Sequence, residues 1–144
     1  MTDNVIAQHK HFIARADLRK FFGPNEKEEF GEWFEELIDK LDMQLLSGPH
    51  MVYVDRPGLR GWTGVCIIET SHIAIHVWDE GEIVLAQLDV YTCGGMDRDA
   101  IFDHLDRFEP YRVEFMILDR EYDLDQIDNG TVFFEDEDAD DYNS

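Results

Sequence analysis

The stretch GWTGVCIIETSHIAIHVW, residues 61–78, is rich in β-branched and aromatic residues and decides the fold expected of this chain. Such residues favour strands, so we expect a long strand at the centre of a sheet. Strand alternation places His72 and His76 on one face and Ser71 on the other. A serine and two histidines within an apolar strand make it a candidate functional site. A partly polar strand face is the alternative interpretation.

Further strands are expected around this one, and residues 83–93 follow it after a short acidic turn, which predicts a hairpin. The other strand segments are residues 11–15, 43–54 (interrupted at Gly48-Pro49) and 111–119.

Two helices are expected because apolar residues recur at intervals of three and four. The first stripe comprises Phe30, Trp33, Phe34, Leu37, Ile38 and Leu41; the second comprises Ile101, Phe102, Leu105 and Phe108, after Asp97 as N-cap. The pattern predicts an α+β fold, a two-layer α/β sandwich in which a mainly antiparallel sheet carries two amphipathic helices on one face.

The length of 144 residues fits a single domain, which we assign to residues 1–134. Residues 135–144 are strongly acidic, and we expect a disordered tail. The net charge of −21 argues against nucleic-acid binding, which needs a basic surface. No apolar run reaches the ~20 residues that span a membrane, and the N-terminus does not resemble a signal peptide. We therefore expect a cytoplasmic protein in which Cys66 and Cys93 are free thiols.

The histidine spacing does not favour a metal site. His72 and His76 are four residues apart on a strand, ~13 Å, which is too far for one ion. His9 and His11 are close enough to share an ion, but no further ligand pattern accompanies them. We expect no bound metal.

Two linked motifs carry a resemblance to a known family. The segments TSHIAIHVWDE (70–80) and LDVYTCGG (88–95) resemble the bacterial and archaeal S-adenosylmethionine decarboxylases, whose strands read Glu-Ser-His-x-x-x-His-Thr-Trp/Tyr-Pro-Glu and Asp-Val-Phe-Thr-Cys-Gly. GWTGVCII is similar to the family's Gly-x-Ser-Gly strand, and HKHFIARA to its opening strand. The resemblance covers about residues 9–120. The matching positions are Ser71, His72, His76, Trp78 and Glu80, then Asp89, Thr92, Cys93 and Gly94, with Thr63 in place of the serine.

The resemblance implies a proenzyme that cuts itself between Thr70 and Ser71 and converts Ser71 into a pyruvoyl cofactor. That group forms a Schiff base with a small amino-acid substrate and accepts the electrons released by decarboxylation. His76 would remove a proton during processing, and the Thr63 hydroxyl would stabilise the oxyanion of the acyl shift. Cys93 would return a proton to the substrate carbon.

The resemblance further implies that Trp78 and Glu80 contribute to substrate binding, that the protein is a homodimer, and that its product supplies aminopropyl groups for spermidine synthesis. Thr70 stands where the family has Glu, and residues 55–61 lack the aromatic ring that stacks the adenine. Two alternatives follow from these departures: a pyruvoyl-dependent decarboxylase of ornithine or arginine, and an unprocessed homologue with a binding or regulatory role.

Overall fold

The computed structural model describes residues 9–134, so the expected acidic tail lies outside the described part of the chain. Within that range an antiparallel seven-stranded sheet runs in the order β2-β3-β4-β5-β1-β6-β7. The strands are β1 (Lys10–Leu18), β2 (Leu45–Val54), β3 (Gly61–Ile68), β4 (Ser71–Trp78), β5 (Val84–Thr92), β6 (Pro110–Asp119) and β7 (Asp125–Phe133).

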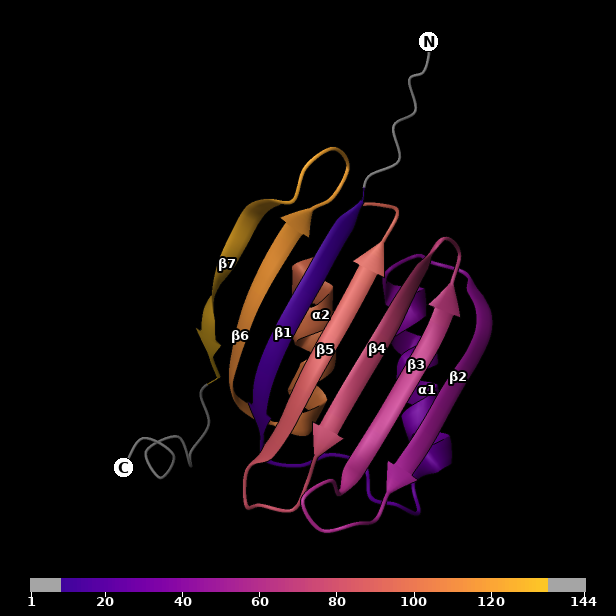
Figure 1. The fold of residues 1–144 in the computed structure, drawn as a ribbon, viewed down its shortest axis with the longest axis vertical. Helices are drawn as coiled ribbons and strands as arrows, with labels where there is room; N and C mark the ends of the chain where they lie inside the picture. Colours follow the sequence, from indigo (N-terminus) through magenta and orange to yellow (C-terminus); the bar gives the residue numbers. More distant parts are fainter. Residues whose placement is uncertain (1–8, 135–144) are drawn as a thin grey trace.

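Two helices accompany the sheet: α1 (Lys27–Lys40) and α2 (Arg98–Leu105), which a short 3-10 turn (Asp106–Phe108) extends. Both lie behind the sheet in Figure 1, which leaves the front face open. The mainly antiparallel sheet and the two helices predicted from the sequence are confirmed. No helix in residues 9–134 has the length and apolar character needed to span a bilayer.

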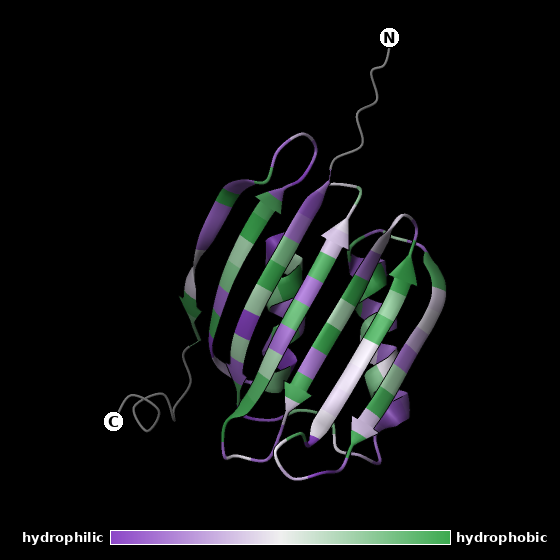
Figure 2. Ribbon diagram, viewed as in Figure 1, coloured by the Kyte–Doolittle hydropathy of each residue, from purple (hydrophilic) through white to green (hydrophobic). Residues whose placement is uncertain are grey.

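The core lies between the helices and the sheet. Alternate residues of β4 and β5 are buried. Figure 2 shows the accompanying bands of hydrophobic and less hydrophobic residues along these strands. Phe30, Trp33 and Phe34 of α1 are fully buried against this face. Trp33 and His104 join the helices, because the Trp33 indole donates to the His104 carbonyl at 3.3 Å and His104 Nε2 donates to the Trp33 carbonyl at 2.7 Å.

The expectation of one long strand over residues 61–78 was wrong. Residues 61–68 and 71–78 form two antiparallel strands, and a tight turn at Glu69 and Thr70 joins them. The turn was not predicted, because neither residue is the Gly, Asn, Asp or Pro that usually marks a turn. The chain therefore reverses direction immediately before Ser71.

Strand β7 was not predicted. It is an edge strand that pairs only with β6, and all of its residues are exposed or half-buried. Its sequence DQIDNGTVF is too polar for a clear apolar alternation. Strand β1 comes first in the sequence but lies between β5 and β6, so the N-terminal strand sits inside the C-terminal half of the sheet (Figure 1).

Candidate active site

The turn between β3 and β4 holds Thr70 in an unfavourable backbone conformation. Its φ is +57°, the left-handed region, which a β-branched residue rarely adopts. Such a conformation costs of order 1–3 kcal/mol. The next residue, Ser71, is 8% exposed, and its hydroxyl has no hydrogen-bond partner within the described residues. A strained residue and an unsatisfied buried hydroxyl therefore lie on either side of the Thr70–Ser71 peptide bond. Both kinds of feature are concentrated at functional sites.

Cys93 reaches this turn from the end of β5. Its thiol donates to the Glu69 carbonyl at 3.4 Å, and the Thr70 hydroxyl donates to the same oxygen at 2.7 Å. The Glu69 amide in turn donates to the Gln44 carbonyl at 2.9 Å. The structure thus brings together three residues that the sequence singled out: Thr70, Ser71 and Cys93.

Thr63 and His76 form a second group. They are direct partners across β3 and β4, and Thr63 Oγ1 lies 3.1 Å from His76 Nδ1. Both side chains are on the open face, whereas Ser71 faces the helices with the buried residues of β4. The opposite orientation of Ser71 and His76 predicted from strand parity is confirmed. Five residues of strand, ~16 Å, also separate them, so one chain does not bring His76 to Ser71.

Trp78 and Glu80 lie at the same end as His76. The Trp78 ring is 6.2 Å from the His76 ring. The Glu80 carboxylate accepts the backbone N–H groups of Gly58 and Arg60, so it closes the loop between β2 and β3. These two residues are therefore remote from Ser71 of the same chain.

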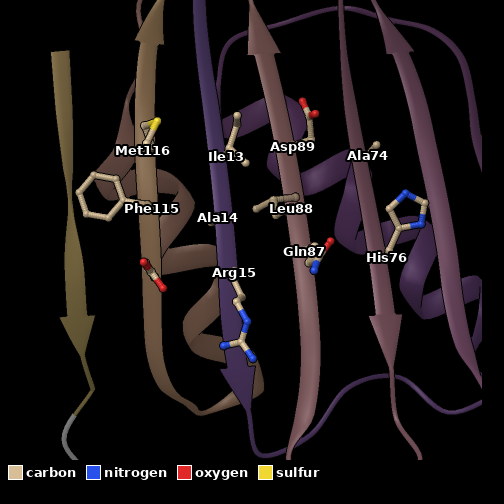
Figure 3. Close-up of a pocket in the computed structure, with 11 residues that line it drawn as sticks. Ile13, Ala14, Arg15, Ala74, His76, Gln87, Leu88, Asp89, Phe115 and Met116 are labelled. Atoms are coloured by element: carbon tan, nitrogen blue, oxygen red, sulfur yellow. The ribbon is translucent and has the colours of Figure 1, made fainter. Parts of the chain in front are cut away.

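A hollow of about 440 Å³ lies in the middle of the open face, over β4, β5, β1 and β6. Figure 3 shows side chains of both charges around it, and its polar lining residues are Arg15, His76, Gln87, Asp89 and Glu114. The hollow extends over the part of the sheet that separates His76 from the Ser71 end.

A second hollow, of about 390 Å³, adjoins the turn. Its polar lining is Thr70, Ser71, His72, Tyr91 and Arg120, and its apolar lining is Leu46, Ile67 and Ile68. The Arg120 guanidinium lies over the Tyr91 ring, 4.5 Å from its centroid. This space is large enough for part of a small substrate to reach residue 71.

Sequence reasoning missed a group centred on Asp89. Asp89 Oδ1 lies 2.6 Å from His11 Nε2 and 3.2 Å from His72 Nε2, and the three polar atoms are all within 4.8 Å of one another. Arg120 lies 3.1 Å from the other nitrogen of His11. The group joins β1, β4 and β5, so only the strand order, which places His11 and His72 each opposite Tyr91, reveals it.

Comparison with known proteins decides the family. A family model described as S-adenosylmethionine decarboxylase matches residues 24–121, more than half of the chain. The chain belongs to the S-adenosylmethionine decarboxylase family. It is similar to the S-adenosylmethionine decarboxylase proenzyme of Archaeoglobus fulgidus, with 31% identity over 88 residues, 60% of this chain and 73% of the relative.

A second member, the proenzyme of Persephonella marina, is 40% identical over 62 residues, 42% of this chain and only 45% of the relative. Among solved structures, the adenosylmethionine decarboxylase of Aquifex aeolicus matches with a TM-score of 0.62 and 23% identity, over 88% of this chain and 99% of that one. At that identity the match shows a shared fold.

In this S-adenosylmethionine decarboxylase family member, the residues matched to the family motifs divide between two ends of the sheet. Thr70, Ser71 and Cys93 occupy one end. Thr63 and His76 lie towards the other, with Trp78 and Glu80 beyond them.

Proposed function

We propose that this protein decarboxylates S-adenosylmethionine with a pyruvoyl group made from its own Ser71. Family membership supports this substrate over ornithine or arginine. The observation that carries the proposal is the buried Ser71 hydroxyl, which has no hydrogen-bond partner among residues 9–134, after a strained Thr70 and with the Cys93 thiol at the same turn. The product would serve as an aminopropyl donor for spermidine synthesis. Free Cys66 and Cys93 support a reducing compartment, the cytoplasm.

The first step is cleavage of the chain. The Ser71 hydroxyl attacks the Thr70 carbonyl, and an ester replaces the amide. A base then removes the α-proton of residue 71, the ester C–O bond breaks, and the chain ends at Thr70 as a carboxylate. Water replaces the nitrogen of residue 71, which leaves as ammonia, and a carbonyl remains. Relief of the Thr70 conformation favours the first step, because the strained amide is consumed.

The residues at this end fit the group that results. The second hollow gives a substrate access to residue 71, and Cys93 is adjacent. A pyruvoyl carbonyl supplies an electron sink to an amino-acid substrate. Cys93 is the proton donor for the carbon that loses CO₂, since its S–H group lies at the turn beside residue 71.

The base and the oxyanion donor come from a second copy of the chain in this proposal. The distance of ~16 Å between His76 and Ser71 leaves the site incomplete in one protomer. If two open faces pack about a two-fold axis that crosses the strands near Ala74, the Ser71 end of each protomer faces the partner's Thr63 and His76. The homodimer therefore completes two equivalent sites.

The open face has the composition of such an interface. It exposes the apolar side chains of Ile13, Val52, Ile67 and Met116, each 37–64% exposed. An isologous interface of this kind is the commonest in homodimers. The partner's Trp78 and Glu80 then approach the hollow beside residue 71. This position agrees with the substrate-binding role that the family resemblance implies for them.

Intact mass under denaturing conditions tests the proposal. We expect two fragments, residues 1–70 and 71–144, the second with the mass of a pyruvoyl end, and CO₂ release from S-adenosylmethionine. The Ser71→Ala variant is the matched control and stays at 16.9 kDa. A wild-type chain that remains uncut and resists hydroxylamine and borohydride contradicts the proposal and supports an unprocessed binding protein. Release of CO₂ only from ornithine or arginine contradicts the choice of substrate.

A further inference from the structure

The contacts around Asp89 determine where the protons of two histidines lie. Arginine has only N–H donors, so Nδ1 of His11 accepts from Arg120 at 3.1 Å. The neutral His11 ring then carries its proton on Nε2, which points at Asp89 Oδ1 at 2.6 Å. An ionised carboxylate only accepts, so His72 Nε2 also donates to Asp89, at 3.2 Å.

This assignment leaves one basic nitrogen. In the neutral His72 ring the lone pair is on Nδ1, because the proton is on Nε2. The His72 side chain is 42% exposed and lines the hollow beside Ser71. A histidine whose other nitrogen donates to a carboxylate is the usual arrangement of a general base, since the carboxylate fixes the tautomer and stabilises the imidazolium.

The same contacts argue against a metal ion on these three residues. A histidine that binds a metal through Nε2 carries its proton on Nδ1 and donates it to an acceptor. At His11 that nitrogen faces the donor Arg120 instead. The Nε2 protons of both histidines also occupy the positions that an ion would need.

The proposed reaction needs a base at this place. The α-amino group of the substrate is an ammonium near neutral pH, and it has no lone pair until it loses a proton. Among the described residues of one chain, His72 is the imidazole that lines the hollow, and His76 is at the other end of β4. The partner's His76 is assigned to the α-proton of residue 71 during cleavage, so a separate base is needed for the substrate.

We propose that His72, held by Asp89, takes the proton from the substrate's α-ammonium before the nitrogen bonds to the carbonyl at residue 71. The N–H bonding pair stays on the substrate nitrogen, and the proton moves to His72 Nδ1. The imidazolium formed is then paired with the Asp89 carboxylate. This assignment rests on the proposed decarboxylase function. It makes His72 a catalytic residue and Asp89 its positioning residue.

The test uses the full chain with His72→Asn and Asp89→Asn, and with His50→Asn as the matched control. His50 is on β2 and bonds only Ser47 among the described contacts. We expect His72→Asn to be cleaved like wild type and its kcat/KM to fall about 100-fold, the usual contribution of a general base. We expect His72→Ala to regain activity with added imidazole, and His50→Asn to match wild type.

Two readouts do not depend on turnover. In the uncleavable Ser71→Ala chain, ¹⁵N NMR is expected to place the proton of neutral His72 on Nε2, and Asp89→Asn is expected to abolish that preference. A proton on Nδ1, a His72→Asn kcat/KM within threefold of wild type, or stoichiometric Zn²⁺ binding that requires His11 overturns the proposal. An uncut His72→Asn chain reassigns the histidine to cleavage and also overturns it. An uncut wild-type chain instead refutes the decarboxylase function itself.

Discussion

Thr63 and His76 face each other across β3 and β4 with 3.1 Å between Oγ1 and Nδ1, although the serine that they are expected to serve begins β4 five residues away. An alternating strand also directs Ser71 to the opposite face. The pair is well formed, but the serine of its own chain lies ~16 Å away along the strand, and this distance is the main structural argument for a site shared between two protomers.

A complementation experiment follows from this geometry. We expect His76→Asn and Ser71→Ala each to remain uncut when expressed alone. When the two are co-expressed with different tags, the His76→Asn chain is expected to be cut, because the Ser71→Ala partner supplies its His76. Intact mass identifies which chain is cleaved. Two differently tagged His76→Asn chains are the control; a mixed sample that stays uncut places the site within one protomer.

The strain at Thr70 predicts a gain in stability on substitution. In the Ser71→Ala chain, Thr70→Gly removes a cost of about 1–3 kcal/mol and adds about 0.5–1 kcal/mol of chain entropy. We expect the free energy of unfolding to rise by about 1 kcal/mol, as measured by urea denaturation. Thr70→Ser, which keeps a Cβ and the hydroxyl bonded to Glu69, is the matched control. Equal stability of the two variants contradicts the strain.

Cys93 is expected to matter for decarboxylation and not for cleavage. Its thiol contacts the Glu69 carbonyl, one residue before the bond that is cut. We expect Cys93→Ala to give the same two fragments as wild type, with kcat lower by about 100-fold because the proton donor is missing. Fragment masses and CO₂ release separate the two effects. A chain that is cut and fully active assigns the proton donor elsewhere.

The two thiols are expected to differ in reactivity. Burial, with a smaller contribution from Glu35, raises the pKa of the Cys66 thiol to about 12, whereas Cys93 is only half-buried. We expect a disulfide reagent at pH 8 to modify one thiol in the native Ser71→Ala chain and the second only after denaturation. Peptide mapping should locate the first label on Cys93; rapid labelling of Cys66 contradicts its burial.

His104 predicts how stability depends on pH. Burial lowers the pKa of His104 below its ordinary value of 6.5, and its hydrogen bond to the Trp33 carbonyl only partly opposes this. The unfolded chain therefore binds the proton more tightly, so this contribution is full above pH 6.5 and falls as the pH drops below it. Urea denaturation between pH 5 and 7 should give a steeper pH dependence for wild type than for His104→Gln; equal slopes contradict it.

Local sequence patterns predicted most helices and strands. An element that buries one side has apolar residues at the regular spacing of a helix or a strand. Phe30, Trp33 and Phe34 of the α1 stripe are fully buried as expected, whereas Leu41, at the C-cap, is half-buried. The turn at Glu69 and Thr70 was not predicted, because the alternation of apolar residues continues on both sides of it. Strand β7 was not predicted, because an edge strand with little burial has no strong alternation of apolar and polar residues.

The sequence supplied candidate site residues but not their arrangement in space. The motif resemblance selected Ser71, His76 and Cys93. Strand alternation predicted that Ser71 and His76 lie on opposite faces, as they do in the structure. The group of His11, His72 and Asp89 could not be read from the sequence, because its members meet only when β1 enters the sheet beside β5.

The place of β1 has a consequence for the protein after cleavage. A cut between residues 70 and 71 would leave β1, β2 and β3 on one polypeptide and β4 to β7 on the other. Since β1 is hydrogen-bonded to β5 on one side and β6 on the other, the pieces are interlocked. They cannot separate without opening ladders on both sides of β1. The mature protein would then consist of two fragments that stay associated through shared β-ladders. Only the uncut precursor would have to fold, because cleavage follows folding.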